Sequence, residues 1–314
     1  MSNLLFSMNA TFPIFLVMML GYFFRKKNII TENLASGMNT FVFKIALPVS
    51  LFSQLDSVDF SEVWDTEYVV FCFLATLLSI GIGVLISFIF KDKNDRGEFV
   101  QGSYRSSASL LGMAYIENIY GTATMGSLMM LGCVPLYNVM AVLILSLMNG
   151  NGESLDIRQL KRTFKGILLN PIIWGILLGF AWALTGLKMP EMFQTTIGYI
   201  GRLASPMGLL AMGATLNFSS IRGKLAPILV GSFLKLVGYT AIFIPIAIWL
   251  GFRQEKLIAA LIMLGSASTV AGYVMARNMN HDGVVSSGIV VITTLGSVFT
   301  LTFWIWLLRS LGMV

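Results

Sequence analysis

Charge is scarce in this sequence, since Asp, Glu, Lys and Arg together make up 11% of its 314 residues, against roughly 25% in soluble domains. Apolar residues account for 56% of the chain, and the mean hydropathy is +0.80. A bilayer accepts such long apolar runs, and only helices or closed barrels satisfy their backbone there. The composition excludes an ordinary soluble domain and predicts an all-α polytopic membrane protein, whose immediate partner is the lipid bilayer.

Reactive side chains are equally scarce, with one histidine and two cysteines. Cys72 and Cys133 lie in separate apolar runs without redox or metal-site spacing, so neither a disulfide framework nor a bound metal is expected. The acidic residues lie in loops or at the ends of runs, which leaves no carboxylate for a proton relay at mid-membrane. No nucleophile and base share the membrane depth, so an enzyme is not expected. His281 falls in a short loop, where a solvated side chain is expected.

The net charge of +6 does not indicate a nucleic-acid partner, because the basic residues lie in short loops between apolar runs. The loops near 25–27, 91–96, 158–165 and 222–224 hold most of them. We therefore expect these loops in the cytoplasm, with both termini outside the plasma membrane.

Ten runs are long enough to cross a hydrocarbon core about 30 Å thick, at about 5–24, 34–55, 67–90, 99–118, 122–148, 166–186, 194–217, 225–250, 256–277 and 284–309.

Two segments of the chain repeat each other, because Ala46–Phe60 reads ALPVSLFSQLDSVDF and Ala204–Phe218 reads ASPMGLLAMGATLNF. Five runs per half is an odd number, so the second half must enter the membrane in the opposite orientation. The sequence therefore predicts two inverted five-helix repeats, residues 1–148 and 165–314, joined by a cytoplasmic linker at 149–164. Pro48 and Pro206, which match in the repeat, are expected to kink their helices.

Hydroxyl groups and glycines gather near the middle of the fourth and ninth runs, at Gly102–Gly112 and Leu264–Gly272. Close packing through small residues explains one such cluster. Two clusters at matching places favour two discontinuous helices at a binding site. Their free N–H groups and positive dipole ends suit an anion.

Four basic residues lie inside or at the edges of runs, where a central charge costs about 2.5–3.5 kcal/mol; they are Lys44, Arg105, Arg202 and Lys235. Arg105 directly precedes the hydroxyl cluster, which favours a role in binding the charge of the substrate or in gating. Arg202 is near enough to a run end to reach the membrane surface instead. Lys235 either neutralises carbonyls at a helix break or faces the substrate path. This excess of buried positive charge favours an anionic substrate.

The chain resembles the auxin efflux carrier family, in the short bacterial branch that includes proteins described as malate or malonate permeases. The residues that carry the resemblance run through the chain in order: Ala46-Leu47-Pro48, Tyr104-Arg105, Leu111-Gly112, Leu136-Tyr137-Asn138, Asn170-Pro171 and Ala204–Gly213. The chain departs from the family pattern at Ser106 or Ser107 and at Met113, where the family often has Asn and Pro. The long loop of plant auxin carriers is absent, so auxin is not the expected substrate.

The resemblance implies a ten-helix fold similar to bile-acid symporters and NhaA-type antiporters. Helices 1, 2, 6 and 7 would form a scaffold domain, and helices 3–5 and 8–10 a transport domain that moves as an elevator. Helices 4 and 9 would cross as broken helices beside the substrate.

We therefore expect a secondary active transporter of small organic anions, mono- or dicarboxylates such as malate or malonate. Hydroxyl groups would contact the carboxylate, Asn138 would orient it and Arg105 would supply charge; the remaining candidates in the site are Ser107, Ser109, Gly112, Ser266, Ser268, Thr269 and Gly272. Ser106 and Lys235 are candidates for charge balance or coupling. No cofactor is expected, although H⁺ or Na⁺ could be a coupling ion. A homodimer is possible, and a carboxylate receptor or an anion channel remains an alternative.

Overall fold

The computed structural model describes residues 2–56, 64–108, 113–120, 124–148, 166, 168–187 and 189–314. Its regular elements in these ranges are all helices, with no strand. The first half holds α1 (Ser2–Lys26), α2 (Glu32–Phe41), η1 (Val42–Ala46), α3 (Leu47–Asp56), α4 (Thr66–Ser87), α5 (Lys93–Tyr104), α6 (Met113–Tyr120) and α7 (Thr124–Leu147). The second half holds α9 (Pro171–Thr185), α10 (Glu191–Arg202), α11 (Ala204–Thr215), α12 (Phe218–Gly223), α13 (Leu225–Phe233), η3 (Leu234–Gly238), α14 (Tyr239–Trp249), α15 (Gln254–Gly265), α16 (Val270–Asn278) and α17 (Val284–Ser310).

Within the described residues, six helical stretches are long and apolar enough to cross a membrane: Glu32–Ser53, Thr66–Ser87, Thr124–Leu147, Leu225–Trp249, Gln254–Asn278 and Val284–Ser310. A seventh apolar helix, α9, is shorter. These stretches confirm the prediction of an all-α protein that passes the membrane several times.

The helix boundaries follow local capping chemistry. Asp65 caps α4 by accepting a hydrogen bond from Tyr68 N at 3.0 Å, and Asn170 caps α9 by accepting one from Ile172 N at 2.9 Å. Pro171 follows at the first helical position, where its missing N–H has no partner to lose. Gly186 then ends α9 with a φ of 64°, a conformation that glycine adopts without strain.

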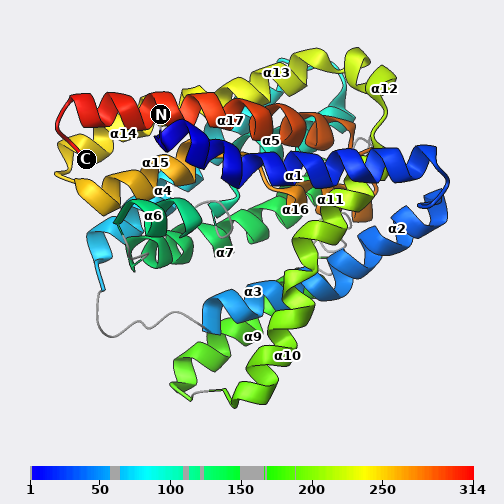
Figure 1. Cartoon of the computed structure of the whole chain (residues 1–314), viewed down its shortest axis with the longest axis horizontal. Helices are drawn as coiled ribbons and strands as arrows, with labels where there is room; N and C mark the ends of the chain where they lie inside the picture. The colour runs from blue at the N-terminus through cyan, green and yellow to red at the C-terminus, as the bar shows by residue number, and fades with distance from the viewer. Residues whose placement is uncertain are drawn as a thin grey trace.

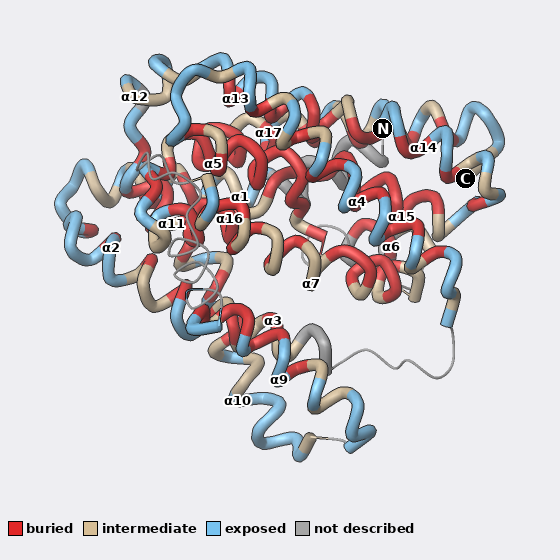
Figure 2. Tube along the Cα trace, turned by 180° about the vertical axis from the view of Figure 1, so that it is seen from behind, coloured by how far each residue is buried: buried red, intermediate tan, exposed pale blue. Residues whose placement is uncertain are grey.

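The helices form two groups that meet along one seam. In Figure 1, α3, α9 and α10 lie together at the lower edge, and the larger group above them consists of α4, α5, α7 and α13–α17. α1 and α11 pack on one another, and each also touches the larger group, α1 at α17 and α11 at α16. Figure 2 shows that buried residues concentrate in α5, α15 and α16, whereas α10 is largely exposed and α9 is buried along one face only.

The turns between helices gather charged residues at one end of the molecule, which we call the basic face. It includes the turns at 27–31, 88–92 and 279–283 and the segment 216–224, which contains α12. Lys224 joins three of these segments by ion pairs, because its Nζ lies 2.5 Å from an Asp95 oxygen and 3.6 Å from an Asp282 oxygen. Burial lowers the Lys224 pKa, but the hydrogen bond to Asp95 and the negative charges of Asp95, Asp282 and Asp92 together outweigh it and leave that pKa raised.

The prediction of a solvated His281 is wrong. The side chain is only 6% exposed, and its Nε2 lies 2.9 Å from the carbonyl oxygen of Leu145 at the end of α7. The turn before α17 folds the imidazole under α7, where it satisfies one of the carbonyls that a helix end leaves without a partner. A short loop in the sequence does not reveal this burial.

Candidate functional site

Two helix interruptions meet at the centre of the molecule. α5 ends at Tyr104 and α15 ends at Gly265, and the residues after each are extended. The two extended segments bond to each other, because Ser107 N donates to Ala267 O at 3.0 Å and the hydroxyls of Ser106 and Ser266 lie 2.5 Å apart. Ser106 also donates to Ile262 O at 3.3 Å. The polar clusters of the fourth and ninth runs are therefore brought together, as the sequence predicted.

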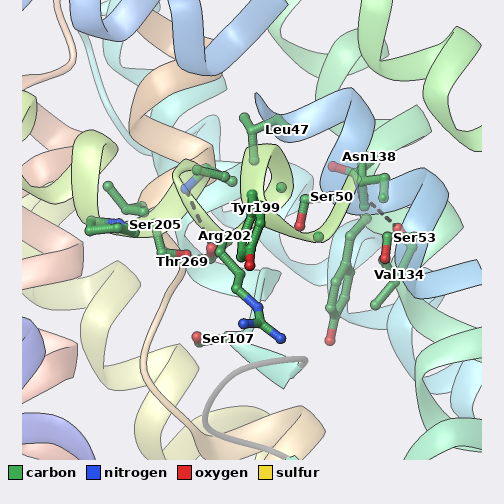
Figure 3. Close-up of a pocket in the computed structure, with 18 of the residues that line it drawn as sticks. Leu47, Ser50, Ser53, Ser107, Val134, Asn138, Tyr199, Arg202, Ser205 and Thr269 are labelled. Carbon is green, nitrogen blue, oxygen red and sulfur yellow. Dashed lines mark hydrogen bonds between the residues drawn. The ribbon is translucent and has the colours of Figure 1, made fainter. Parts of the chain in front are cut away.

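A cavity of about 750 Å³ lies beside this crossover. One wall comes from the crossover, α7 and α16, and its polar members are Arg105, Ser106, Ser107, Tyr137, Asn138 and Thr269. The opposite wall comes from α3, α10 and α11, and its polar members are Ser50, Ser53, Glu191, Gln194, Thr195, Tyr199, Arg202 and Ser205. Figure 3 shows side chains from both walls reaching into the space between them.

Arg105 is the buried charge of the first wall, with 3% of its surface exposed. Its guanidinium donates to the Asn138 Oδ1 at 3.0 Å, to the Tyr137 carbonyl at 3.2 Å and to the Met275 sulfur at 3.2 Å. Asn138 is held in turn by its own bond to the Val134 carbonyl. All these partners are neutral, and among the described residues no carboxylate pairs with Arg105 and nothing accepts from its Nε.

The N-terminus of α16 adds a second positive feature to the same wall. Thr269 caps this helix, its hydroxyl accepting from Ala271 N at 3.3 Å. Thr269, Val270 and Ala271 all line the cavity. The first N–H groups of a helix lack intrahelical partners and carry the positive end of its dipole, so this end of α16 favours an anion in the cavity.

The structure describes nine of the eleven predicted site residues, and five of these nine line the cavity. Arg105, Ser106, Ser107, Asn138 and Thr269 face it, whereas Ser266, Ser268, Gly272 and Lys235 lie behind it. Ser109 and Gly112 lie outside the described residues.

The residues behind the cavity hold the crossover in place. Ser266 is bonded to Ser106, and Ser268 N donates to the Thr293 hydroxyl at 3.0 Å. The Gly272 carbonyl accepts from Gln101 Nε2 at 2.8 Å, which links α16 to α5. Lys235 donates to backbone carbonyls at the helix ends, so of the two roles left open for it, carbonyl neutralisation is the one that its contacts show.

Most of the second wall was missed by sequence reasoning. Figure 3 shows Arg202 extending from α10 into the cavity, so its charge faces this space and does not reach only for the membrane surface. The spacing in α10 could have indicated this wall: apart from Gly201, its lining positions recur at intervals of three and four, at 191, 194, 195, 198, 199 and 202. That interval places side chains on one face of a helix.

A second cavity, of about 590 Å³, lies at the basic face. Its charged members are Arg25, Glu32, Arg277 and Asp282. Between the two cavities α11 packs on α16: a Cβ on Gly208 would lie 3.4–3.5 Å from Val270 and Val274, and the Thr215 hydroxyl bonds that of Tyr273. These contacts close the seam between the cavities.

Comparison with known proteins gives a consistent result. Residues 6–305 match the model of a family described as membrane transport protein, that of the auxin efflux carriers. An uncharacterized transporter of Methanothermobacter thermautotrophicus is 23% identical over 304 residues, which covers 95% of this chain and 97% of the relative. The uncharacterized transporter YfdV of Escherichia coli K12 is 22% identical over 320 residues, with 98% and 99% covered.

Proposed function

The chain belongs to this family of membrane transport proteins, and from that premise we propose that it is a secondary carrier of small organic anions. Mono- and dicarboxylates of the size of malonate or malate are the substrates that we propose. The observation that carries the proposal is Arg105, a buried guanidinium that lines the cavity and whose described partners are all neutral.

The electrostatics of the cavity favour a carboxylate over a cation. A charge held inside a membrane protein is costly unless something pairs with it, and a bound carboxylate would pair with Arg105. Other groups nearby can also donate hydrogen bonds to an anion. They are the hydroxyls of Ser106, Ser107 and Thr269, the N–H groups at the N-terminus of α16, and the Arg202 guanidinium across the cavity. Glu191 is the acidic residue among the lining positions, and it is the exposed first residue of α10.

The architecture that we propose is ten spanning helices in two inverted repeats. The interruptions between α5 and α6 and between α15 and α16 support it, because they fall in the fourth and ninth predicted runs. The matched prolines support it as well: Pro48 lies in the first turn of α3, directly after η1, and Pro206 lies in the first turn of α11, directly after the break at Leu203. The scaffold would be α1–α3 and α9–α11, and the transport domain α4–α7 and α13–α17.

We further propose alternating access by an elevator movement of the transport domain. The cavity has one wall from each proposed domain, so a sliding movement would change which end of the molecule it opens to. The positive-inside rule assigns the basic face to the cytoplasm of a plasma-membrane protein, with both termini outside. The closed seam between α11 and α16 lies on the cytoplasmic side of the cavity in this assignment, and a substrate would then enter from outside.

Arg105→Gln tests the proposal directly. A hydrogen bond to a charged group is worth about 1.5–3 kcal/mol, so losing the contact should weaken carboxylate binding by about 10- to 150-fold. Binding of malonate and malate to the solubilised protein would be measured by calorimetry, and uptake in proteoliposomes. Arg253→Gln is the matched control, since Arg253 also donates to backbone carbonyls but lies outside the cavity.

Asn138→Asp offers a second test, in which Arg105 keeps its partner and only the amide's bond to the Val134 carbonyl is lost. The new carboxylate would take the place of the amide oxygen that Arg105 already contacts at 3.0 Å. It would neutralise the guanidinium and compete with a bound anion. Carboxylate binding as tight as in the wild type, in both this variant and Arg105→Gln, would refute the anion site.

A further inference from the structure

Lys235 is a lysine with no exposed surface, carried on the π-helical turn η3 between α13 and α14. Its ammonium lies 2.9 Å from the Leu264 carbonyl oxygen, 3.0 Å from that of Met263 and 3.5 Å from that of Tyr104. An ammonium has three donors, and each of them meets one carbonyl. Among the described residues no carboxylate forms an ion pair with it.

These three carbonyls belong to two helix ends. Tyr104 is the last residue of α5, and Met263 and Leu264 are in the last turn of α15. The last carbonyls of a helix have no intrahelical partner and form the negative end of its dipole. Two negative ends therefore point at one ammonium, directly behind the segments that cross at Ser106 and Ser266.

Carbonyl oxygens at the C-terminal ends of interrupted membrane helices are the groups that coordinate Na⁺ in carriers that use it. In this chain the same kind of oxygen cluster is already filled by a covalently attached cation. The ammonium neutralises the carbonyls, and its stem occupies the approach from the α13 side.

We propose that the Lys235 ammonium is the resident cation of the helix crossover, replacing a dissociable metal ion. The crossover of the wild-type protein then binds no Na⁺. Where the proposed function holds, anion transport is not coupled to Na⁺ at this place. Removing the ammonium should instead create a site that takes a small external cation.

Lys44 provides a matched control. It too is a lysine on a π-helical turn within a predicted run, η1 between α2 and α3. Its side chain is exposed rather than buried, so its truncation removes a charge without opening a carbonyl cluster.

The experiment compares wild type, Lys235→Ala and Lys44→Ala in detergent, without substrate. Melting temperatures would be measured in choline chloride and with NaCl, KCl or propylammonium chloride replacing it at constant ionic strength. Propylammonium reproduces the atoms that the truncation of Lys235 removes. We expect wild type and Lys44→Ala to be indifferent to the cation. Lys235→Ala should melt lower in choline and recover with a small cation, by about 3 °C at ten times the dissociation constant of that cation.

Three results would overturn the proposal: a saturable stabilisation of wild type by Na⁺ over choline, a Lys235→Ala variant as stable as wild type in choline, or a destabilised variant that none of the cations restores. If Lys235→Ala does not fold, the wild-type series decides, since indifference to Na⁺ supports the proposal and stabilisation refutes it. Because no substrate is present, failure here leaves the anion site untouched, and failure of the Arg105 experiment leaves this result standing.

Discussion

Gly213→Ala should destabilise the protein by forcing α1 away from α11. A Cβ built on Gly213 would lie 1.9 Å from the Met18 carbonyl oxygen and 3.1 Å from Tyr22 N, both backbone atoms of α1. On the other side of the same contact, a Cβ on Gly21 would lie 2.3 Å from the Leu210 carbonyl oxygen. The two backbones are therefore in direct contact, as small residues permit in membrane helices.

The size of the effect follows from these distances. Real Cβ atoms essentially never approach another atom within 3.0 Å, so the helices must separate by at least about 1 Å, and neither backbone has a side chain that could rotate away. Overpacking of this kind costs about 1–3 kcal/mol, and contact with backbone on a rigid helix places it at the upper end. Alanine recovers about 0.8–1.0 kcal/mol in helix propensity, which must be measured separately.

Gly81→Ala measures that propensity alone. Gly81 lies within α4, and a Cβ there would meet nothing within 4 Å. Both variants would be melted in the same detergent, followed by intrinsic fluorescence. The clash alone should separate their melting temperatures by at least about 4 °C, with Gly81→Ala at or above wild type. Melting of the two variants within about 1 °C of each other would show that the contact between α1 and α11 is not the one described.

Two further predictions concern the N-terminal cap of α4 and the hydrogen bond between α11 and α16. The hydrogen bonds from Lys256 and from Tyr68 N hold the Asp65 pKa below its usual range. The ionised Asp65 therefore contributes stability above about pH 4, and this contribution is lost as pH falls through the lowered folded-state pKa. Asp65→Asn should make the melting temperature less dependent on pH between pH 6 and pH 3, and an unchanged slope would contradict this. Thr215→Val and Tyr273→Phe each remove the hydrogen bond between these two hydroxyls, so each should lower the unfolding free energy by about 0.5–1.5 kcal/mol. Because both variants remove the same bond, the double variant should lose little more than either one, and additive losses would contradict the bond.

The interruptions of the fourth and ninth runs were predictable because the chemistry is local. Hydroxyl and glycine clusters mark where a membrane helix can break, and Ser106, Ser107 and Ser266 meet where the sequence predicted. Arg105 and Asn138 were predictable for a related reason, since a charge or an amide inside an apolar run needs a partner. The structure shows that each is a partner of the other.

The direction in which individual side chains point was not predictable. Ser268 and Thr269 were both expected to contact substrate, but successive residues of an extended segment point to opposite sides. Thr269 faces the cavity, and Ser268 is turned behind it, 5% exposed. The second wall was missed because α10 faces the crossover only through the docking of two groups of helices, which local sequence does not report.

Lys235 and Arg105, the two buried cations of the crossover, differ in their hydrogen-bond partners and therefore in the role that each can have. Lys235 has a carbonyl for each of its donors, whereas Arg105 keeps an Nε with no acceptor in the described structure and lines the cavity. The Tyr104 carbonyl, which the Lys235 ammonium contacts at 3.5 Å, belongs to the peptide that joins Tyr104 to Arg105. In the transport that we propose, a movement that carries an anion on Arg105 would also carry the Lys235 charge, and the two helix ends would stay neutralised.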